Sequence, residues 1–313
     1  MNEQLKPVYE GFKAEFSGVA AMQGTINQSV PVNGQRVWIP LDGREIEVVI
    51  YRQEDVNAPV LFCSYGGGFV MGGCAIDNLM WKTVAERFGC TLISIGYRRA
   101  PEFHFPCAVF DVYDTVCYFA EHAAEYQLNK EKFMVFGASA GANLSTAASI
   151  LDNLNGTHYI KKQILNYPYL DLATDPADKG HHMGEILMYY FFPEAYPATP
   201  DDLKNPLLSP VYATSKELQG LPETIMVCGE NDALRQEGER YLKMLSENGV
   251  KTYYMVADGM EHGFIEFNFS LQYTPLEQSF CSDATKENFK NGKLAQETER
   301  ALAFIESILD SNC

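Results

Sequence analysis

The chain has 313 residues, of which 46% are hydrophobic and 12% aromatic, and this composition indicates a sizeable buried core and excludes a disordered protein. The formal net charge of −17 argues against nucleic acid and anionic membranes as partners. No run of about 20 apolar residues could span a membrane, and the first residues lack the apolar core of an export signal, so we expect a cytoplasmic protein.

The first predicted element is a helix near residues 5–22, followed by a loop that contains Pro31. Two strand-like runs, 36–40 and 45–52, flank Asp42-Gly43, a pair that is typical of a hairpin turn. Strands and helices then alternate along the chain. The remaining strands are expected at 59–65, 91–97, 132–137, 162–167, 224–229 and 252–257, and the helices near 77–89, 109–126, 140–152, 235–248 and 294–310.

The alternation and the continuous apolar strands indicate an α/β fold with a mostly parallel central sheet and helices on both faces. An aromatic-rich segment, 176–206, shows no regular pattern and is expected to be irregular. We therefore expect one domain over 1–313, with a small cap, instead of two domains. The eight cysteines show neither a CxxC pair nor a zinc-like spacing with histidine, so no metal site is predicted.

Residues 137–141 read GASAG, a GxSxG pattern. The motif follows a predicted strand directly and opens a predicted helix, which is the strand–turn–helix setting of a nucleophile elbow. Such a turn presents the hydroxyl of Ser139 above the carboxyl edge of the sheet. The free amides at the start of the following helix suit a developing oxyanion. Ser139 is therefore the candidate nucleophile, although a serine at this place can also be an ordinary helix cap.

A serine needs a base, and six histidines are available. His262 lies in DGMEHGF, just after the predicted strand 252–257, so it belongs to a loop at a strand's carboxyl end. It is the candidate general base. The carboxylate that orients it is expected in Glu230-Asn231-Asp232, after the strand 224–229; Asp232 is preferred and Glu230 is the alternative. The order Ser139, Asp232, His262 is that of α/β-hydrolases.

Several long motifs between about residues 58 and 265 resemble the hormone-sensitive-lipase-like family of α/β-hydrolase carboxylesterases, which includes bacterial acetyl esterases. They are YGGGFVMG, YRRAPEFHFPCAVFDVYD, VFGASAGANL, NYPYLDL, LSP, GENDALRQEGERYLKML and DGMEHGF. The resemblance implies an α/β-hydrolase fold with a small helical cap, here about 1–35 together with 176–206. It also implies ester hydrolysis through an acyl-enzyme on Ser139, without a cofactor.

The same resemblance implies an oxyanion hole built from backbone amides. The donors would be Gly67 and Gly68 of the glycine loop and Ala140 after the nucleophile, and the loop also contains Tyr65 and Gly66. The family usually has His where this chain has Tyr65, and two interpretations stay open. The Tyr65 hydroxyl either anchors the loop to neighbouring backbone or donates to the oxyanion itself.

Other departures from the family are Ala138 and Gly96, where the family usually has Asp, and Ala233, where it usually has Pro. Residues 266–292 look like an insertion before the last helix. None of these changes removes a member of the predicted triad.

The predicted function is hydrolysis of short-chain, acetyl-like esters, and the predicted partner is a small-molecule ester, with a homodimer as a further possibility. In the segment 176–206, Tyr189 and Phe192 are candidates to line the acyl pocket, although these aromatic residues could instead form the core of the cap. The alternatives in function are a non-catalytic small-molecule binder of the same fold and an amidase or peptidase. Retention of His262 argues against the first, and the chain is too short for the added domain that usually accompanies the second.

Overall fold

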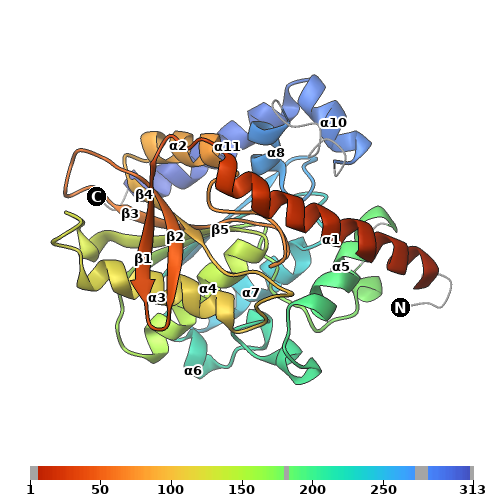
Figure 1. Cartoon of the computed structure of the whole chain (residues 1–313), viewed down its shortest axis with the longest axis horizontal. Helices are drawn as coiled ribbons and strands as arrows, with labels where there is room; N and C mark the ends of the chain where they lie inside the picture. Colours follow the sequence, from red (N-terminus) through yellow and green to blue (C-terminus); the bar gives the residue numbers. More distant parts are fainter. Residues whose placement is uncertain (1–5, 180–182, 272–280, 311–313) are drawn as a thin grey trace.

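The computed structural model describes residues 6–179, 183–271 and 281–310 (Figure 1). Parts of the predicted cap, 1–5 and 180–182, and part of the predicted insertion, 272–280, lie outside the described residues. None of the helices in the described ranges is long and apolar enough to cross a membrane.

In the described part of the chain, one eight-stranded sheet forms the centre of the molecule, in the order β1-β2-β4-β3-β5-β6-β7-β8. The strands β1 and β2 form the predicted hairpin and pair antiparallel, as do β2 and β4, while all later neighbours pair parallel. The strand bounds are β1 Gln35–Leu41, β2 Arg44–Tyr51, β3 Val60–Ser64, β4 Thr91–Gly96, β5 Phe133–Ala138, β6 Ile160–Asn166, β7 Glu223–Gly229 and β8 Thr252–Ala257. The predicted mostly parallel sheet is confirmed.

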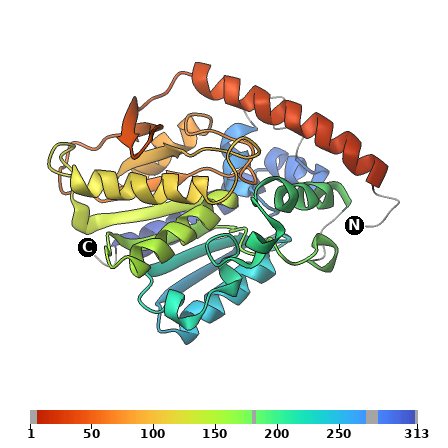
Figure 2. The same cartoon turned by 60° about the horizontal axis from the view of Figure 1, so that its bottom comes forward.

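Helices cover both faces of the sheet, as predicted: α2 and α11 lie on one face, and α3, α4 and α7 lie on the other (Figures 1 and 2). Burial on both faces explains why strands such as β3 and β5 consist only of buried residues. The helix bounds are α1 Lys6–Ser29, α2 Asn78–Arg87, α3 Cys107–Glu121, α4 Ala140–Leu154, α5 Met183–Ala195, α6 Ser215–Leu218, α7 Arg235–Glu247, α8 Phe264–Ser270, α10 Asp283–Lys290 and α11 Lys293–Asp310.

Helix α1 extends seven residues beyond the end predicted for it, to Ser29. Its last turns are polar, but they make tertiary contacts with the loop after β3. The side chain of Gln23 accepts a hydrogen bond from the amide of Gly72 at 2.9 Å, and that of Asn27 accepts one from the amide of Ala75 at 2.8 Å. These contacts stabilise a helical end that local sequence preference does not indicate.

The segment 176–206, predicted to be irregular, contains the helix α5. It has apolar residues on all sides and Pro193 in its interior, so no amphipathic period marks it in the sequence. It packs against α1, where the ring of Phe16 lies 5.3 Å from that of Phe191 and 6.0 Å from that of Phe192. The predicted insertion likewise contains helical structure, the end of α8 and all of α10.

Candidate active site

A sharp turn between β5 and α4 carries Ser139. Its φ of 54° and ψ of −118° lie outside the regions that a residue with a Cβ prefers. The glycines on either side permit this turn. A Cβ on Gly137 would lie 2.2 Å from the carbonyl oxygen of Gly141, and a Cβ on Gly141 would lie 2.0 Å from the carbonyl oxygen of Ser64. The backbone therefore has the form of the predicted elbow, with Ser139 partly exposed at the end of the strand.

Three side chains predicted to act together are brought together by the fold. The Nε2 atom of His262 lies 2.8 Å from Oγ of Ser139, and its Nδ1 atom lies 3.0 Å from Oδ2 of Asp232. The Asp232 side chain is fully buried, and its Oδ1 accepts a hydrogen bond from the amide of Leu234 at 2.8 Å. A carboxylate held in this way keeps the proton of the imidazole on Nδ1 and leaves Nε2 free to accept one from the serine.

Neighbouring parallel strands explain this arrangement. Strands β7 and β8 end side by side, with Gly229 opposite Ala257, so the loops that follow them leave the same edge of the sheet. The amide of Asn231 donates to the carbonyl of Met260 at 2.8 Å and fixes one loop against the other. Glu230, the alternative partner of the base, instead accepts the amide of Gly259 at 2.8 Å.

The glycine loop after β3 passes beside the nucleophile. A Cβ on Gly66 would lie 3.6 Å from Cβ of Ser139, and the two following glycines have positive φ angles, 121° at Gly67 and 60° at Gly68. Within the described ranges, the amides of Gly67, Gly68 and Ala140 donate to no other residue. Three backbone donors are therefore available near Ser139, as the prediction of an oxyanion hole requires.

Comparison with known proteins identifies the family to which a chain with this site belongs. A family model for the alpha/beta hydrolase fold matches residues 61–266. The chain belongs to this family. The predicted fold and the predicted family are both confirmed.

Among its relatives, this α/β hydrolase is 32% identical to a protein of Acanthamoeba polyphaga mimivirus that carries the name alpha/beta hydrolase R526, with 91% of this chain and 82% of that one covered. It is 29% identical to an ethyl acetate hydrolase of Pseudomonas putida, with coverage of 72% and 73%. A solved esterase of Pyrobaculum calidifontis superposes with a TM-score of 0.77 at 26% identity, with 97% and 92% covered.

Tyr65, the residue in front of the glycine loop, is buried in this α/β hydrolase and stacks on Tyr97 with ring centroids 4.1 Å apart. The hydroxyl of Tyr65 donates to the carbonyl of Tyr97 at 3.1 Å, and the hydroxyl of Tyr97 donates to the carbonyl of Tyr65 at 2.9 Å. Burial raises the pKa of both hydroxyls above the ordinary value, so they stay protonated donors. These contacts favour the interpretation of Tyr65 as a loop anchor.

Phe192 lies against the glycine loop from the side of α5. A Cβ on Gly68 would come within 2.1 Å of the Phe192 ring, so the ring occupies the space that a side chain there would need. Tyr189 is buried as well and packs edge-on against Phe192, with ring centroids 6.1 Å apart, and against Tyr169, at 5.5 Å. Of the two residues proposed for the acyl pocket, Phe192 has the direct contact with the loop.

Two residues near His262 were not predicted. The ring of Tyr167, just after β6, packs edge-on against the imidazole of His262 at 5.2 Å, and its hydroxyl donates to Glu266 in the first turn of α8. Burial raises the pKa of Glu266 to about 6. Tyr167 could have been found from the sequence, because it lies at the carboxyl end of a predicted strand. Glu266 gave no such signal, because it lies where the motifs that resemble the family end.

No group of three or more histidine, cysteine or acidic side chains suited to a metal ion occurs among the residues that the structure describes. The arrangement consists of a hydroxyl nucleophile, an imidazole base with a buried carboxylate, and free amides. It is suited chemically to acyl transfer.

Proposed function

We propose that this chain is a serine carboxylesterase that hydrolyses short-chain, acetyl-like esters through an acyl-enzyme. The observation that carries the proposal is the pair of contacts of His262, 2.8 Å to Ser139 and 3.0 Å to the buried Asp232. The ester as substrate class is supported by relatives and structural neighbours named as esterases.

In the first step, Oγ of Ser139 attacks the ester carbonyl carbon while its proton passes to Nε2 of His262. Asp232 stabilises the imidazolium that forms. The carbonyl oxygen becomes an oxyanion, which the amides of Gly67, Gly68 and Ala140 would stabilise. One such donor typically lowers the barrier by about 3 kcal/mol.

In the second step, the tetrahedral intermediate collapses, the bond to the alcohol oxygen breaks, and the imidazolium protonates the leaving alcohol. A water molecule then attacks the acyl group on Ser139, with His262 again accepting the proton. Collapse of this second intermediate releases the carboxylic acid and returns the proton to Ser139. Every proton is carried by His262, and no cofactor takes part.

The preference for short acyl chains is supported by Phe192, because its ring lies directly against Gly68 of the proposed oxyanion hole and leaves no room for a side chain there. We propose α1 and α5 as the cap over this place, within one domain. The relative that is an ethyl acetate hydrolase is consistent with a small acyl group.

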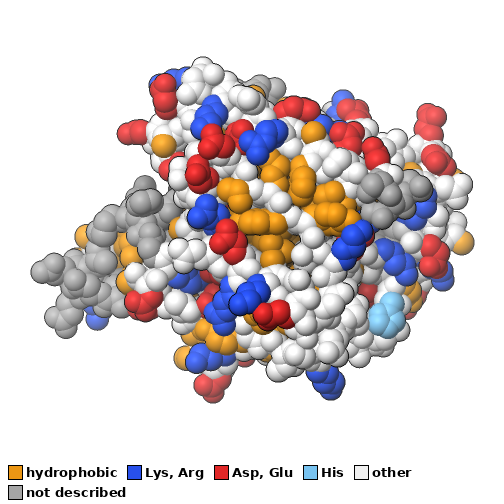
Figure 3. Space-filling model, turned by 180° about the vertical axis from the view of Figure 1, so that it is seen from behind, with side chains coloured by type: hydrophobic (Ala, Val, Ile, Leu, Met, Phe, Trp, Pro, Cys, Tyr) orange, Lys and Arg blue, Asp and Glu red, His pale blue; other side chains and the backbone are white. Residues whose placement is uncertain are grey.

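Among the partners, we propose a small-molecule ester. A homodimer is a further proposal, for which a hydrophobic patch on the rear face is one candidate surface (Figure 3).

The test compares kcat/KM on the nitrophenyl esters of acetate, butyrate and decanoate, with Ser139→Ala as the control. Activity that disappears in the control and falls with chain length is the expected result, whereas faster turnover of decanoate overturns the short-chain proposal. Labelling with an organophosphate, mapped to its residue, separately tests the nucleophile: the label is expected on Ser139, and a label elsewhere overturns the mechanism.

A further inference from the structure

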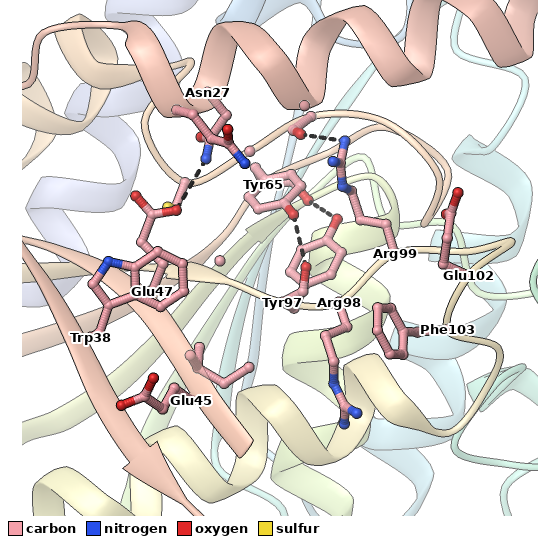
Figure 4. Close-up of a pocket in the computed structure, with 17 residues that line it drawn as sticks. Asn27, Trp38, Glu45, Glu47, Tyr65, Tyr97, Arg98, Arg99, Glu102 and Phe103 are labelled. Atoms are coloured by element: carbon pink, nitrogen blue, oxygen red, sulfur yellow. Dashed lines mark hydrogen bonds between the residues drawn. The ribbon is translucent and has the colours of Figure 1, made fainter.

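A cavity of about 340 Å³ lies among the end of α1, the β1–β2 hairpin, the glycine loop and the segment after β4 (Figure 4). None of Ser139, Asp232 and His262 lines it. The cavity does share Tyr65 with the glycine loop, so it adjoins the candidate active site without belonging to it. The proposed esterase reaction assigns no role to this space.

The sheet itself shows why the space is open. Trp38 on β1 is opposite Glu47 on β2, and Glu47 is in turn opposite Gly96 on β4, so the three residues form one row across the strands. The row ends in Gly96, which lines the cavity without a side chain. A Cβ on Gly96 would lie 2.8 Å from the carbonyl oxygen of Glu47 and 3.2 Å from Sγ of Cys74.

The cavity has one uncovered aromatic wall. Trp38 is 59% exposed, and no described ring or cationic side chain stacks on its indole. On the opposite side, Phe103 is 43% exposed, but the guanidinium of Arg98 already lies 5.1 Å above its ring. The indole face of Trp38 is therefore the aromatic surface that a ligand can use.

Most of the charges around the cavity already have partners. Glu47 forms an ion pair with Arg36 and accepts a hydrogen bond from Asn27, and Arg98 binds the buried carboxylate of Asp111. Arg99 donates to the carbonyl of Gly72 at 2.8 Å and forms no ion pair with a carboxylate among the residues that the structure describes.

Two acidic residues of the lining, Glu45 and Glu102, are exposed and form no ion pair within the described residues. The uncompensated charge is thus two carboxylates against the single guanidinium of Arg99. With a net charge of −17 on the whole chain, this site favours a positively charged ligand over an anion.

We propose that this cavity binds a small organic cation with a compact apolar body, such as a quaternary ammonium compound. The cation would lie on the indole face of Trp38, where the ring quadrupole attracts a positive charge. Glu45 lies on the same face of the β1–β2 hairpin as Trp38, two residues before Glu47, and supplies an uncompensated carboxylate on that face. The apolar body of the ligand would cover the floor at Gly96.

Fluorescence gives a direct test, because the chain has two tryptophans and the second, Trp81, is fully buried. We would titrate the wild-type protein with choline and with 3,3-dimethylbutan-1-ol, its neutral isostere, and follow the tryptophan emission. We expect a saturable change with choline and at least about tenfold weaker binding of the neutral compound, since only the charged compound gains from the indole and the carboxylates. Equal affinity for both compounds, or no saturable change at millimolar choline, overturns the proposal.

Variants locate the site, with calorimetry as a readout that does not depend on Trp38. Trp38→Ala and the double variant Glu45→Gln with Glu102→Gln should each weaken choline binding several-fold, while circular dichroism confirms that they are folded. The matched control is Glu54→Gln, which removes an exposed carboxylate that does not line the cavity. Unchanged affinity in both test variants, or an equal loss in the control, overturns the assignment of the site. Binding is measured without turnover, so the outcome is independent of the proposed esterase activity.

Discussion

The hydroxyl of Tyr167 donates a hydrogen bond to the carboxylate of Glu266. Tyr167 follows β6 and Glu266 lies in α8, so this contact ties the helix after His262 to the sheet. The other carboxylate oxygen of Glu266 is buried and has no hydrogen-bond partner within the described residues. Burial is the main cause that raises the pKa of Glu266 to about 6, while the bond from Tyr167 and the nearby His262 lower it.

This raised pKa predicts a pH dependence of stability. The folded protein holds the proton of Glu266 to a higher pH than the unfolded chain does, so the contribution is complete below about pH 4.5 and is lost as the pH rises through about 6. The shift from 4.5 to about 6 corresponds to roughly 2 kcal/mol. In Glu266→Gln this loss should disappear, which urea unfolding at a series of pH values would measure.

The control for this prediction is Glu261→Gln. Glu261 lies directly before His262, but it is partly exposed and accepts a hydrogen bond from the hydroxyl of Thr285. Its removal should leave the fall in stability between pH 4.5 and 6 as in the wild type. A fall of the same size in Glu266→Gln would contradict the assignment to Glu266.

Replacing Tyr65 by Phe tests the anchor interpretation. The variant leaves the buried carbonyl of Tyr97 without its donor, so it should lose about 1–3 kcal/mol of stability. Turnover of nitrophenyl acetate should fall by less than about tenfold, since no oxyanion donor is lost. The matched variant Tyr97→Phe should behave similarly. A loss of about 100-fold in kcat with unchanged stability would instead support a direct donor role of Tyr65.

Phe192→Ala tests whether this ring limits the acyl chain. Removing it should shift the ratio of kcat/KM for decanoate over acetate upward by about tenfold or more, at a cost in stability of about 3–5 kcal/mol. Phe191→Ala is the matched control, because Phe191 is equally buried on the same helix and contacts Phe16. If both variants change the ratio alike, the aromatic residues act as the core of the cap.

Gly68→Ala should slow the reaction because it disturbs the backbone of the glycine loop. The new Cβ would clash with the Phe192 ring, and the φ of 60° at Gly68 is unfavourable for alanine. We expect kcat to fall by about 100-fold, as for loss of one oxyanion donor. Combining Gly68→Ala with Phe192→Ala removes the clash, so the double variant should recover part of this loss. No recovery would show that the clash is not the cause.

The sequence was sufficient for the order of elements and for the three side chains of the candidate triad, because Ser139, Asp232 and His262 each follow a strongly apolar strand. The sequence was insufficient where tertiary contacts determine whether a helix forms and where it ends. The end of α1 depends on the contacts of Gln23 and Asn27, and α5 has no polar face to mark its period. Glu266 could not be foreseen, because its role depends on an aromatic ring that is 99 residues away in the chain.

The reciprocal bonds of Tyr65 and Tyr97 have an evolutionary consequence. Each hydroxyl satisfies the backbone carbonyl of the other residue, so losing one side chain leaves the buried carbonyl of the second residue without its donor and removes the ring on which the second ring stacks. Natural selection therefore acts on the two positions as one unit. Across related sequences, we expect an aromatic residue with a hydroxyl at position 65 to be inherited together with one at position 97, and the two to be lost in the same lineages.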